Sequence, residues 1–272
     1  MHFALAPIIL PHKLFAMSQT IVFIHGLFVN PVCWKHWISF FERHDYTCYA
    51  PANLYHAGDP AALRKHVDPE LGKISLEDEV YHFAGFIDTL PEKPILIGHS
   101  LGGLVVQKLL DMGKGVAGVC IDGVPPKGIY TLEWSFWKSN FPVLNFFKGN
   151  SVYEPNKEWF HYAFCHTLTK EESDKVFDEL VVPESRNIPR DTLKDFAAID
   201  FNKAHSPLLF IAGEKDHIVP NSLARENFEA YKHPGSKKEF IEFAGRTHYI
   251  IGQQGWEEVA GHALYWMQNN ID

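Results

Sequence analysis

Residues 94–103 read ProIleLeuIleGlyHisSerLeuGlyGly, and this stretch decides the fold. An apolar run ends in a serine, Ser100, that has a glycine two residues before it and another two residues after it. Small residues are needed at these places where a strand turns sharply into a helix, because bulkier side chains clash in the bend. The apolar spacing over 101–112 predicts the helix that such a turn requires. We therefore expect Ser100 to be a nucleophile presented at the carboxyl end of a buried strand.

Short β-branched runs alternate with amphipathic segments along the chain, which predicts parallel strands connected by helices. Strands are expected at 20–24, 46–50, 95–97, 116–121, 208–212 and 240–243. Helices are expected at 31–44, 75–90, 101–112 and 256–268. Ser75 and Asp78 form a capping-box pattern at the start of the second helix. The polar segment 51–74, rich in Gly and Pro, is expected to be a loop. The predicted class is α/β, a mostly parallel sheet flanked by helices.

The strand pattern disappears between about residues 125 and 205. Eleven aromatic residues fall within the 33 residues of 130–162, against 14% aromatic residues in the whole chain. Helices are expected to begin at Thr169, where Glu172 completes a capping box, and near Asp191. Most of these aromatic side chains should form the core of a helical lid, and some should face a cavity beneath it. The predicted organisation is an N-terminal extension (1–17), a core (18–127 and 205–272) and a helical cap or lid (128–204).

The amino-acid composition indicates which kinds of binding partner are not expected. The 272 residues are 46% apolar and 21% charged, as in ordinary globular enzymes, and the length suits one α/β domain with an insertion. Thirty-three acidic residues against 25 basic ones give a net charge of −8, which repels phosphate backbones, so no nucleic-acid partner is expected. No apolar run approaches the roughly 18 residues that cross a bilayer, so no stable membrane insertion is expected.

The N-terminal segment and the cysteines indicate the cellular compartment of the protein. The first 17 residues lack a basic start and a small-residue cleavage site, so they are expected to be an extension and not a signal peptide. The four cysteines form no C-x-x-C pair and are too sparse for a disulfide scaffold. Free thiols in a reducing compartment are therefore expected, and with them a cytoplasmic location.

A serine hydroxyl is a weak nucleophile unless a base removes its proton. His248 is the candidate among 16 histidines, because its loop follows the last strand at the sheet edge where Ser100 is expected. Asp216 follows the strand 208–212 at the same edge and is the candidate carboxylate that orients the base. Asp122, at the end of another strand, is its rival.

Together these residues resemble the α/β-hydrolase-fold serine hydrolases, in which nucleophile, acid and base follow one another in this order. The resemblance rests on HisGlyLeuPhe at 25–28, on GlyHisSerLeuGlyGly at 98–103 and on the segments around Asp216 and His248. The N-terminal half is similar to small esterases, lysophospholipase-like proteins and methylesterases. The resemblance implies an oxyanion hole made by two backbone N–H groups, those of Leu27 and Leu101.

The implied reaction is hydrolysis of a small or moderately apolar carboxylic ester, a small-molecule substrate, through an acyl-enzyme on Ser100. Candidates for contact with the substrate are Phe28, Trp134, Trp137, Val219 and Tyr249. The chain has no P-loop or H-E-x-x-H motif, and neither a cofactor nor a metal is expected. The same triad serves C–C hydrolases, hydroxynitrile lyases and cofactor-free perhydrolases or haloperoxidases, and some proteins of this fold are ligand receptors. These alternatives remain open at the level of sequence.

Overall fold

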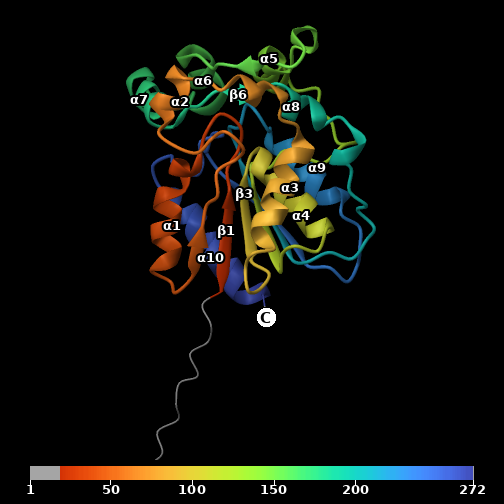
Figure 1. Ribbon diagram of the computed structural model, residues 1–272. Helices are drawn as coiled ribbons and strands as arrows, with labels where there is room; N and C mark the ends of the chain where they lie inside the picture. Colours follow the sequence, from red (N-terminus) through yellow and green to blue (C-terminus); the bar gives the residue numbers. More distant parts are fainter. Residues whose placement is uncertain (1–18, 272) are drawn as a thin grey trace, which may run out of the picture.

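A six-stranded sheet forms the centre of the computed structural model, which describes residues 19–271 (Figure 1). Its order is β2-β1-β3-β4-β7-β8, and every neighbouring pair is parallel. The strands are β1 (Thr20–Ile24), β2 (Thr47–Tyr49), β3 (Ile95–His99), β4 (Ala117–Ile121), β7 (Leu208–Gly213) and β8 (Lys238–Phe243). The predicted α/β class with a parallel sheet is confirmed. The predicted extension 1–17 lies outside the described residues.

Both faces of the sheet are covered, because apolar side chains of its strands point alternately to either side. On β1, Ile21 and Phe23 belong to one core cluster, and Val22 and Ile24 belong to the other. One face carries α1 (Lys35–Glu42), preceded by η1 (Pro31–Trp34), and α10 (Trp256–Asn270). The other face carries α3 (Leu76–Ile87), α4 (Leu101–Asp111) and α9 (Asn221–Ala230). The predicted capping box of Ser75 and Asp78 is present at the start of α3.

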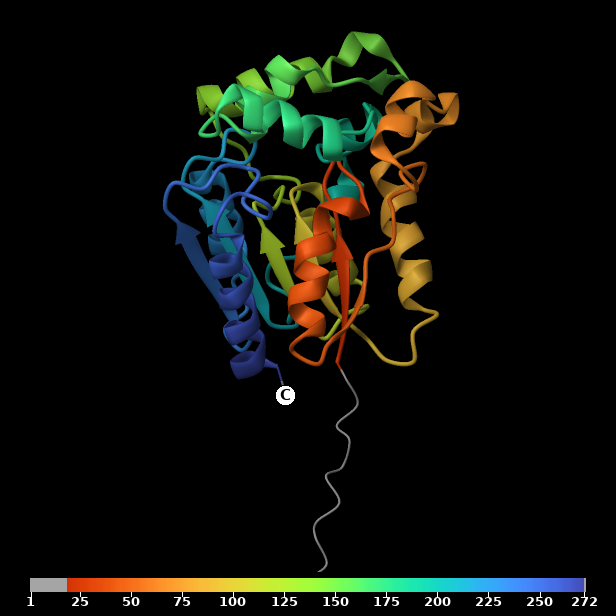
Figure 2. The same cartoon turned by 90° about the vertical axis from the view of Figure 1, so that its left-hand side faces the viewer.

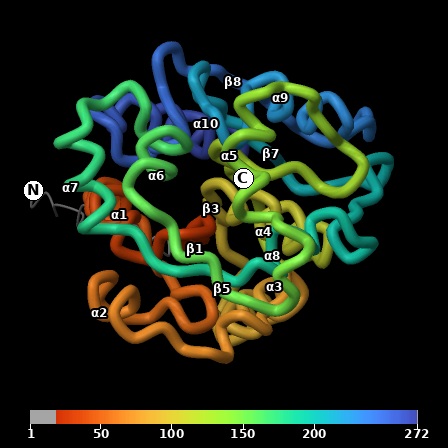
Figure 3. The backbone as a smooth tube through the Cα atoms, turned by 90° about the horizontal axis from the view of Figure 1, so that it is seen from above, coloured from red at the N-terminus to blue at the C-terminus, as the bar shows by residue number. Residues whose placement is uncertain are grey.

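A second layer lies across the carboxyl ends of the strands (Figure 2). Viewed from above, its elements lie around and over the ends of β1 and β3 (Figure 3). This cap contains α5 (Trp134–Leu144), η3 (Phe146–Lys148), β5 (Val152–Tyr153), α6 (Lys157–Phe164), α7 (Lys170–Leu180), β6 (Glu184–Ser185), α8 (Asn187–Asp191) and η4 (Asp195–Ala197). The capping box at Thr169 begins α7 as predicted.

Three local predictions differ from the structure. The cap contains an antiparallel ladder of β5 and β6, whose two-residue strands are too short to show an alternating pattern. A helix ends at Asp191 and does not begin there. The segment 51–74 contains α2 (Pro60–Lys65) and η2 (Pro69–Lys73), each capped by an aspartate, and both are too short to reveal a helical period.

Two further predictions concern the whole of the described chain. All four cysteines are free, as expected. Within residues 19–271, no helix combines the length and the apolar character that crossing a membrane would require.

Candidate active site

Ser100 forms the turn between β3 and α4, with φ 57° and ψ −122°. This left-handed conformation is unfavourable for a residue with a side chain, and the turn depends on the glycines around it. A Cβ atom on Gly98 would lie 2.2 Å from the carbonyl oxygen of Gly102, and one on Gly102 would lie 2.1 Å from that of Ile24. Helix α4 begins directly after Ser100, so the positive end of its dipole faces the hydroxyl. The predicted strand, turn and helix are all present.

His248 and Asp216 form a buried pair at the same edge of the sheet. His248 Nδ1 lies 2.6 Å from Asp216 Oδ2, and both side chains are fully buried. The other carboxylate oxygen accepts hydrogen bonds from the backbone N–H groups of Ile218, at 2.6 Å, and Val219, at 2.9 Å. The carboxylate therefore holds the proton of the imidazole on Nδ1 and leaves Nε2 with a lone pair. Burial lowers the pKa of His248 to about 3, so the ring is neutral at neutral pH.

The imidazole of His248 lies beside the turn that carries Ser100. The neighbouring His99 donates from Nε2 to the backbone carbonyl of His248 at 2.7 Å, and the centroids of the two rings are 4.7 Å apart. Phe164 of α6 covers the ring of His248 edge-on, at 4.8 Å between centroids. His248 Nε2 is buried and has no hydrogen-bond partner among the described residues. An acceptor in this state requires a donor, and a serine hydroxyl is one.

Asp122 directly follows β4 and lies close to this pair. Its Oδ1 accepts a hydrogen bond of 2.7 Å from the N–H of Gly213, and its side chain is fully buried. Burial and the neighbouring charge of Asp216 raise the pKa of Asp122 well above its usual value. Burial raises the pKa of Asp216 as well, but the N–H groups of Val219 and Ile218 favour its charged form, so we assign the negative charge to Asp216 and the proton to Asp122. Of the two candidate acids, Asp216 is the one bonded to His248.

One group of possible metal ligands is found among residues 19–271, and it coincides with this site. His99, Asp122 and His248 each bring a ligand atom within 4.8 Å of the others. Two of the nitrogen atoms already have protein partners. His248 Nδ1 is bonded to Asp216, and His99 Nε2 donates to the backbone carbonyl of His248. The contacts fit a hydrogen-bonded acid–base cluster, and we assign no metal to it.

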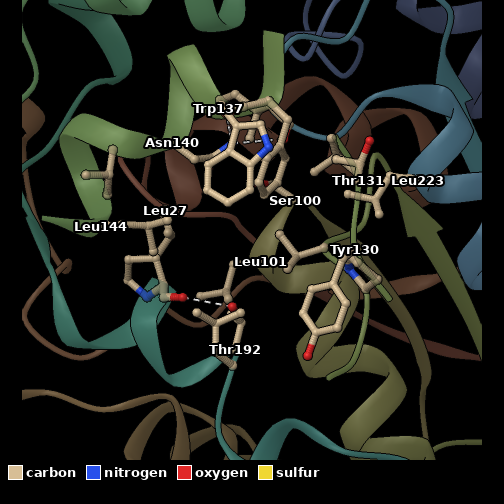
Figure 4. A pocket seen from close by; sticks show the side chains of 18 of the residues that line it. Leu27, Ser100, Leu101, Tyr130, Thr131, Trp137, Asn140, Leu144, Thr192 and Leu223 are labelled. Carbon is tan, nitrogen blue, oxygen red and sulfur yellow. Dashed lines mark hydrogen bonds between the residues drawn. The ribbon is translucent and has the colours of Figure 1, made fainter. Parts of the chain in front are cut away.

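An apolar cavity of about 180 Å³ lies between Ser100 and the cap (Figure 4). Its wall includes five residues singled out in the sequence: Leu27, Phe28, Leu101, Trp137 and Val219. Residues that sequence reasoning missed also line it, among them Asn140 and Leu144 of α5, Thr192 and Leu223. Asn140 and Leu144 lie three and seven residues after Trp137, and this helical spacing is a signal that could have found them.

Two residues expected in the pocket lie elsewhere. Trp134, the first residue of α5, is 75% exposed and is absent from the wall of this cavity. Tyr249 packs against the core on either side and covers Gly252, where an added Cβ would lie 2.3 Å from the tyrosine oxygen.

The sequence profile of the alpha/beta hydrolase family matches residues 21–262, and the chain belongs to this family. The family defines the class of the protein as a hydrolase, and the resemblance in the sequence is confirmed. A comparison with curated proteins found no match.

Solved structures share the fold. A monoacylglycerol lipase from Paleococcus ferrophilus has 19% identity and a TM-score of 0.67, and the match covers 93% of this chain and 96% of that chain. Methylketone synthase I from tomato, solved with 2-tridecanone, has 17% identity and a TM-score of 0.69, with 93% and 99% covered. A methylesterase from Arabidopsis has 16% identity and a TM-score of 0.67, with 92% and 99% covered. At these identities the likeness defines the fold alone.

Proposed function

We propose that this protein hydrolyses a carboxylic ester through an acyl-enzyme on Ser100. One observation carries the proposal: the strained serine turn lines an apolar cavity, and a buried His248–Asp216 pair of 2.6 Å lies beside it. A nucleophile, a base and an orienting carboxylate are the groups that acyl transfer requires. Ester hydrolysis is also consistent with the lipase and the methylesterase that share the fold.

In the first step, Ser100 Oγ attacks the ester carbonyl carbon and its proton passes to His248 Nε2. The carbonyl oxygen becomes an oxyanion, which the backbone N–H groups of Leu27 and Leu101 stabilise. Asp216 keeps the ring in the required tautomer and balances the charge of the imidazolium. When the carbon–oxygen bond to the alcohol breaks, His248 returns the proton to the leaving oxygen.

Hydrolysis of the acyl-enzyme reverses these roles. His248 Nε2 takes a proton from water, whose oxygen attacks the acyl carbon, and the second oxyanion forms in the same place. Collapse of this intermediate breaks the bond to Ser100 Oγ and releases the carboxylic acid, while the serine regains its proton from His248.

The cavity favours a substrate that has an apolar acyl or alcohol group. A cavity of about 150 Å³ binds benzene. By this scale, 180 Å³ takes a group of about six to eight carbons. Methylketone synthase I, which shares the fold, was solved with the apolar ligand 2-tridecanone.

A cytoplasmic location, suggested by the free cysteines, remains a prediction.

Ser100→Ala tests this function. We expect it to abolish both the turnover of p-nitrophenyl esters and labelling by a fluorophosphonate. Ser173→Ala is a matched control, because Ser173 is also buried but lies on α7 in the cap. Normal turnover and labelling of Ser100→Ala would disprove the assignment of the nucleophile.

A further inference from the structure

A buried ionic cluster lies at the junction of the cap and the core, apart from Ser100 and His248. His56 comes from the segment after β2, Glu79 from α3 and Glu184 from β6 of the cap, and each is at most 1% exposed. His56 Nε2 lies 3.2 Å from Glu184 Oε2. Burying charges is costly unless each is paired and hydrogen-bonded, so this arrangement requires an explanation.

The contacts of His56 define its charge. Nδ1 lies 2.8 Å from the carbonyl oxygen of Leu54, and Nε2 lies 3.0 Å from that of Pro183. Carbonyl oxygens only accept hydrogen bonds, so both ring nitrogens must donate, and a neutral imidazole has one N–H. His56 is therefore an imidazolium, paired with Glu184. Burial has the largest single effect and lowers the pKa of His56. The charge and the hydrogen bond of Glu184, together with smaller effects such as that of the Leu54 carbonyl, outweigh burial and raise this pKa to about 9.

The other ionisable groups that face His56 carry little charge at neutral pH. Burial lowers the pKa of His25, at the end of β1, to about 3, and its ring centroid is 5.8 Å from that of His56. Burial raises the pKa of Glu79 to about 8. The cluster thus contains one cation, His56, and one anion, Glu184, which bridge the core and the cap.

Other contacts from the same segment and from the cap hold the loop 26–30, which carries the proposed oxyanion donor Leu27. From the core side, Asn30 Nδ2 donates to the carbonyl of His56 at 3.3 Å and to that of Gly58 at 2.9 Å. From the cap side, the N–H of Val182 donates to the carbonyl of Phe28 at 2.9 Å. Phe28 has φ 68°, an unfavourable conformation for a bulky residue, so the loop keeps its shape only while its surroundings impose it.

Arg64, in α2, attaches the cap to the same segment of the core at a second point. Its guanidinium donates to the carbonyl of Asp178 at 2.9 Å and also to that of Val181, at the end of α7. Cations at the carboxyl end of a helix are favourable because the backbone carbonyls there are unpaired. The segment 53–65 is therefore attached to the loop 26–30 on one side and to the cap on the other.

We propose that His56 is a positioning residue for the oxyanion hole: as an imidazolium between Leu54 and the cap residues Pro183 and Glu184, it fixes the loop 26–30 so that the Leu27 N–H meets the developing oxyanion. This inference rests on the proposed ester hydrolysis. His56 does not line the cavity that Ser100 faces. Its removal should raise the energy of the transition state and leave substrate binding nearly unchanged, because the oxyanion exists only during reaction.

The test compares His56→Gln with His82→Gln as a matched control. His82 Nε2 donates to the carbonyl of Ala52 at 2.9 Å, so it contacts the same segment, but the contact does not involve the cap. The readouts are kcat and KM with p-nitrophenyl butyrate and the affinity for a trifluoromethyl ketone. Addition of the Ser100 hydroxyl to this ketone forms a carbon–oxygen bond, gives the proton to His248 and leaves an oxyanion.

For His56→Gln we expect kcat to fall by about 10² through misplacement of the donor, with KM changed by less than about threefold. The affinity for the ketone should fall by the same factor as kcat. His82→Gln should leave all three values unchanged. Unchanged kcat in folded His56→Gln, or a loss of kcat without a loss of ketone affinity, would overturn the proposal.

The wild-type pH profile provides a test that does not depend on folding of His56→Gln. We expect kcat and ketone affinity to fall together above pH of about 9, where His56 loses its proton. In Glu184→Gln this fall should move to lower pH, because the carboxylate that favours the cation is gone. If kcat and ketone affinity fall at the same pH in Glu184→Gln as in the wild type, the proposal is overturned. If the wild type neither hydrolyses esters nor reacts with a fluorophosphonate, the proposed function fails, and the role of His56 fails with it.

Discussion

His248 Nδ1 and Asp216 Oδ2 are 2.6 Å apart, and neither side chain is exposed to solvent. They are 32 positions apart in the sequence, yet His248 follows β8 and Asp216 follows β7, and the carboxyl ends of these neighbouring parallel strands lie together. The contact leaves Nε2 as the free basic atom of the ring. The role of His248 as the base depends on this contact, and it can be tested at the carboxylate.

Asp216→Asn should lower kcat by about 10³–10⁴, because the amide favours the imidazole tautomer with the proton on Nε2. Asp122→Asn should lower kcat by less than about tenfold, because Asp122 is already neutral and an amide replaces it without loss of charge. Steady-state kinetics of the two variants at pH 7 provide the comparison. A larger loss in Asp122→Asn would make Asp122 the acid that orients the imidazole.

Gly102→Ala should destabilise the protein by several kcal/mol or prevent its folding, because its Cβ would lie 2.1 Å from a backbone oxygen of β1. Gly85→Ala is the control: it lies on α3 and has no atom within 4 Å of the added Cβ. The control should gain about 0.5–1 kcal/mol, as alanine does over glycine in a helix. Urea unfolding measures both changes. Equal stability of the two variants would contradict the close packing of this turn.

Trp137→Ala should shift the preferred acyl chain of p-nitrophenyl esters to greater length, because removal of the indole enlarges the cavity at the cap. Phe147→Ala is the control, since Phe147 is fully exposed and does not line the cavity. Values of kcat/KM over a series from acetate to decanoate report the shift. An unchanged optimum in Trp137→Ala would place the acyl group elsewhere.

The free energy of unfolding should fall as the pH rises from 7.5 to 9. Folding raises the pKa of His56 from 6.5 to about 9 and that of Glu79 from 4.5 to about 8, so these groups bind more protons in the folded protein than in the unfolded chain. His25 and His248, whose pKa folding lowers, have the opposite effect only at lower pH, because above pH 7.5 they are neutral in both states. We expect a loss of at least about 1 kcal/mol, measured by urea unfolding at several pH values. Glu79→Gln should show a shallower slope. A stability that is constant or rises over this range would contradict these protonation states.

Much of the active site could be predicted because its residues follow strands with clear patterns. Ser100 is preceded by a strand and followed by a helix, and Asp216 and His248 lie a few residues after β7 and β8, so the parallel topology places them at one edge. The choice between Asp216 and Asp122 could not be made from sequence, because both follow strands at that edge. Only the side-chain contact with His248 distinguishes them.

The junction of the cap and the core could not be predicted, for a different physical reason. His56 lies in a polar segment without periodicity, and Glu184 lies in a two-residue strand, so neither has a local pattern that indicates burial. Trp134 and Trp137 are one turn apart on α5, where aromatic residues occur on several sides of the helix. Their spacing alone did not indicate which of them faces the cavity.

The most direct test of the central claim is to locate and time the adduct formed with a fluorophosphonate. Mass spectrometry of peptides should place the adduct on Ser100 in the wild type. The rate of labelling should fall at least about 10²-fold in His248→Ala, because the base that takes the serine proton is missing. An adduct on another residue, or labelling of His248→Ala at the wild-type rate, would contradict the account.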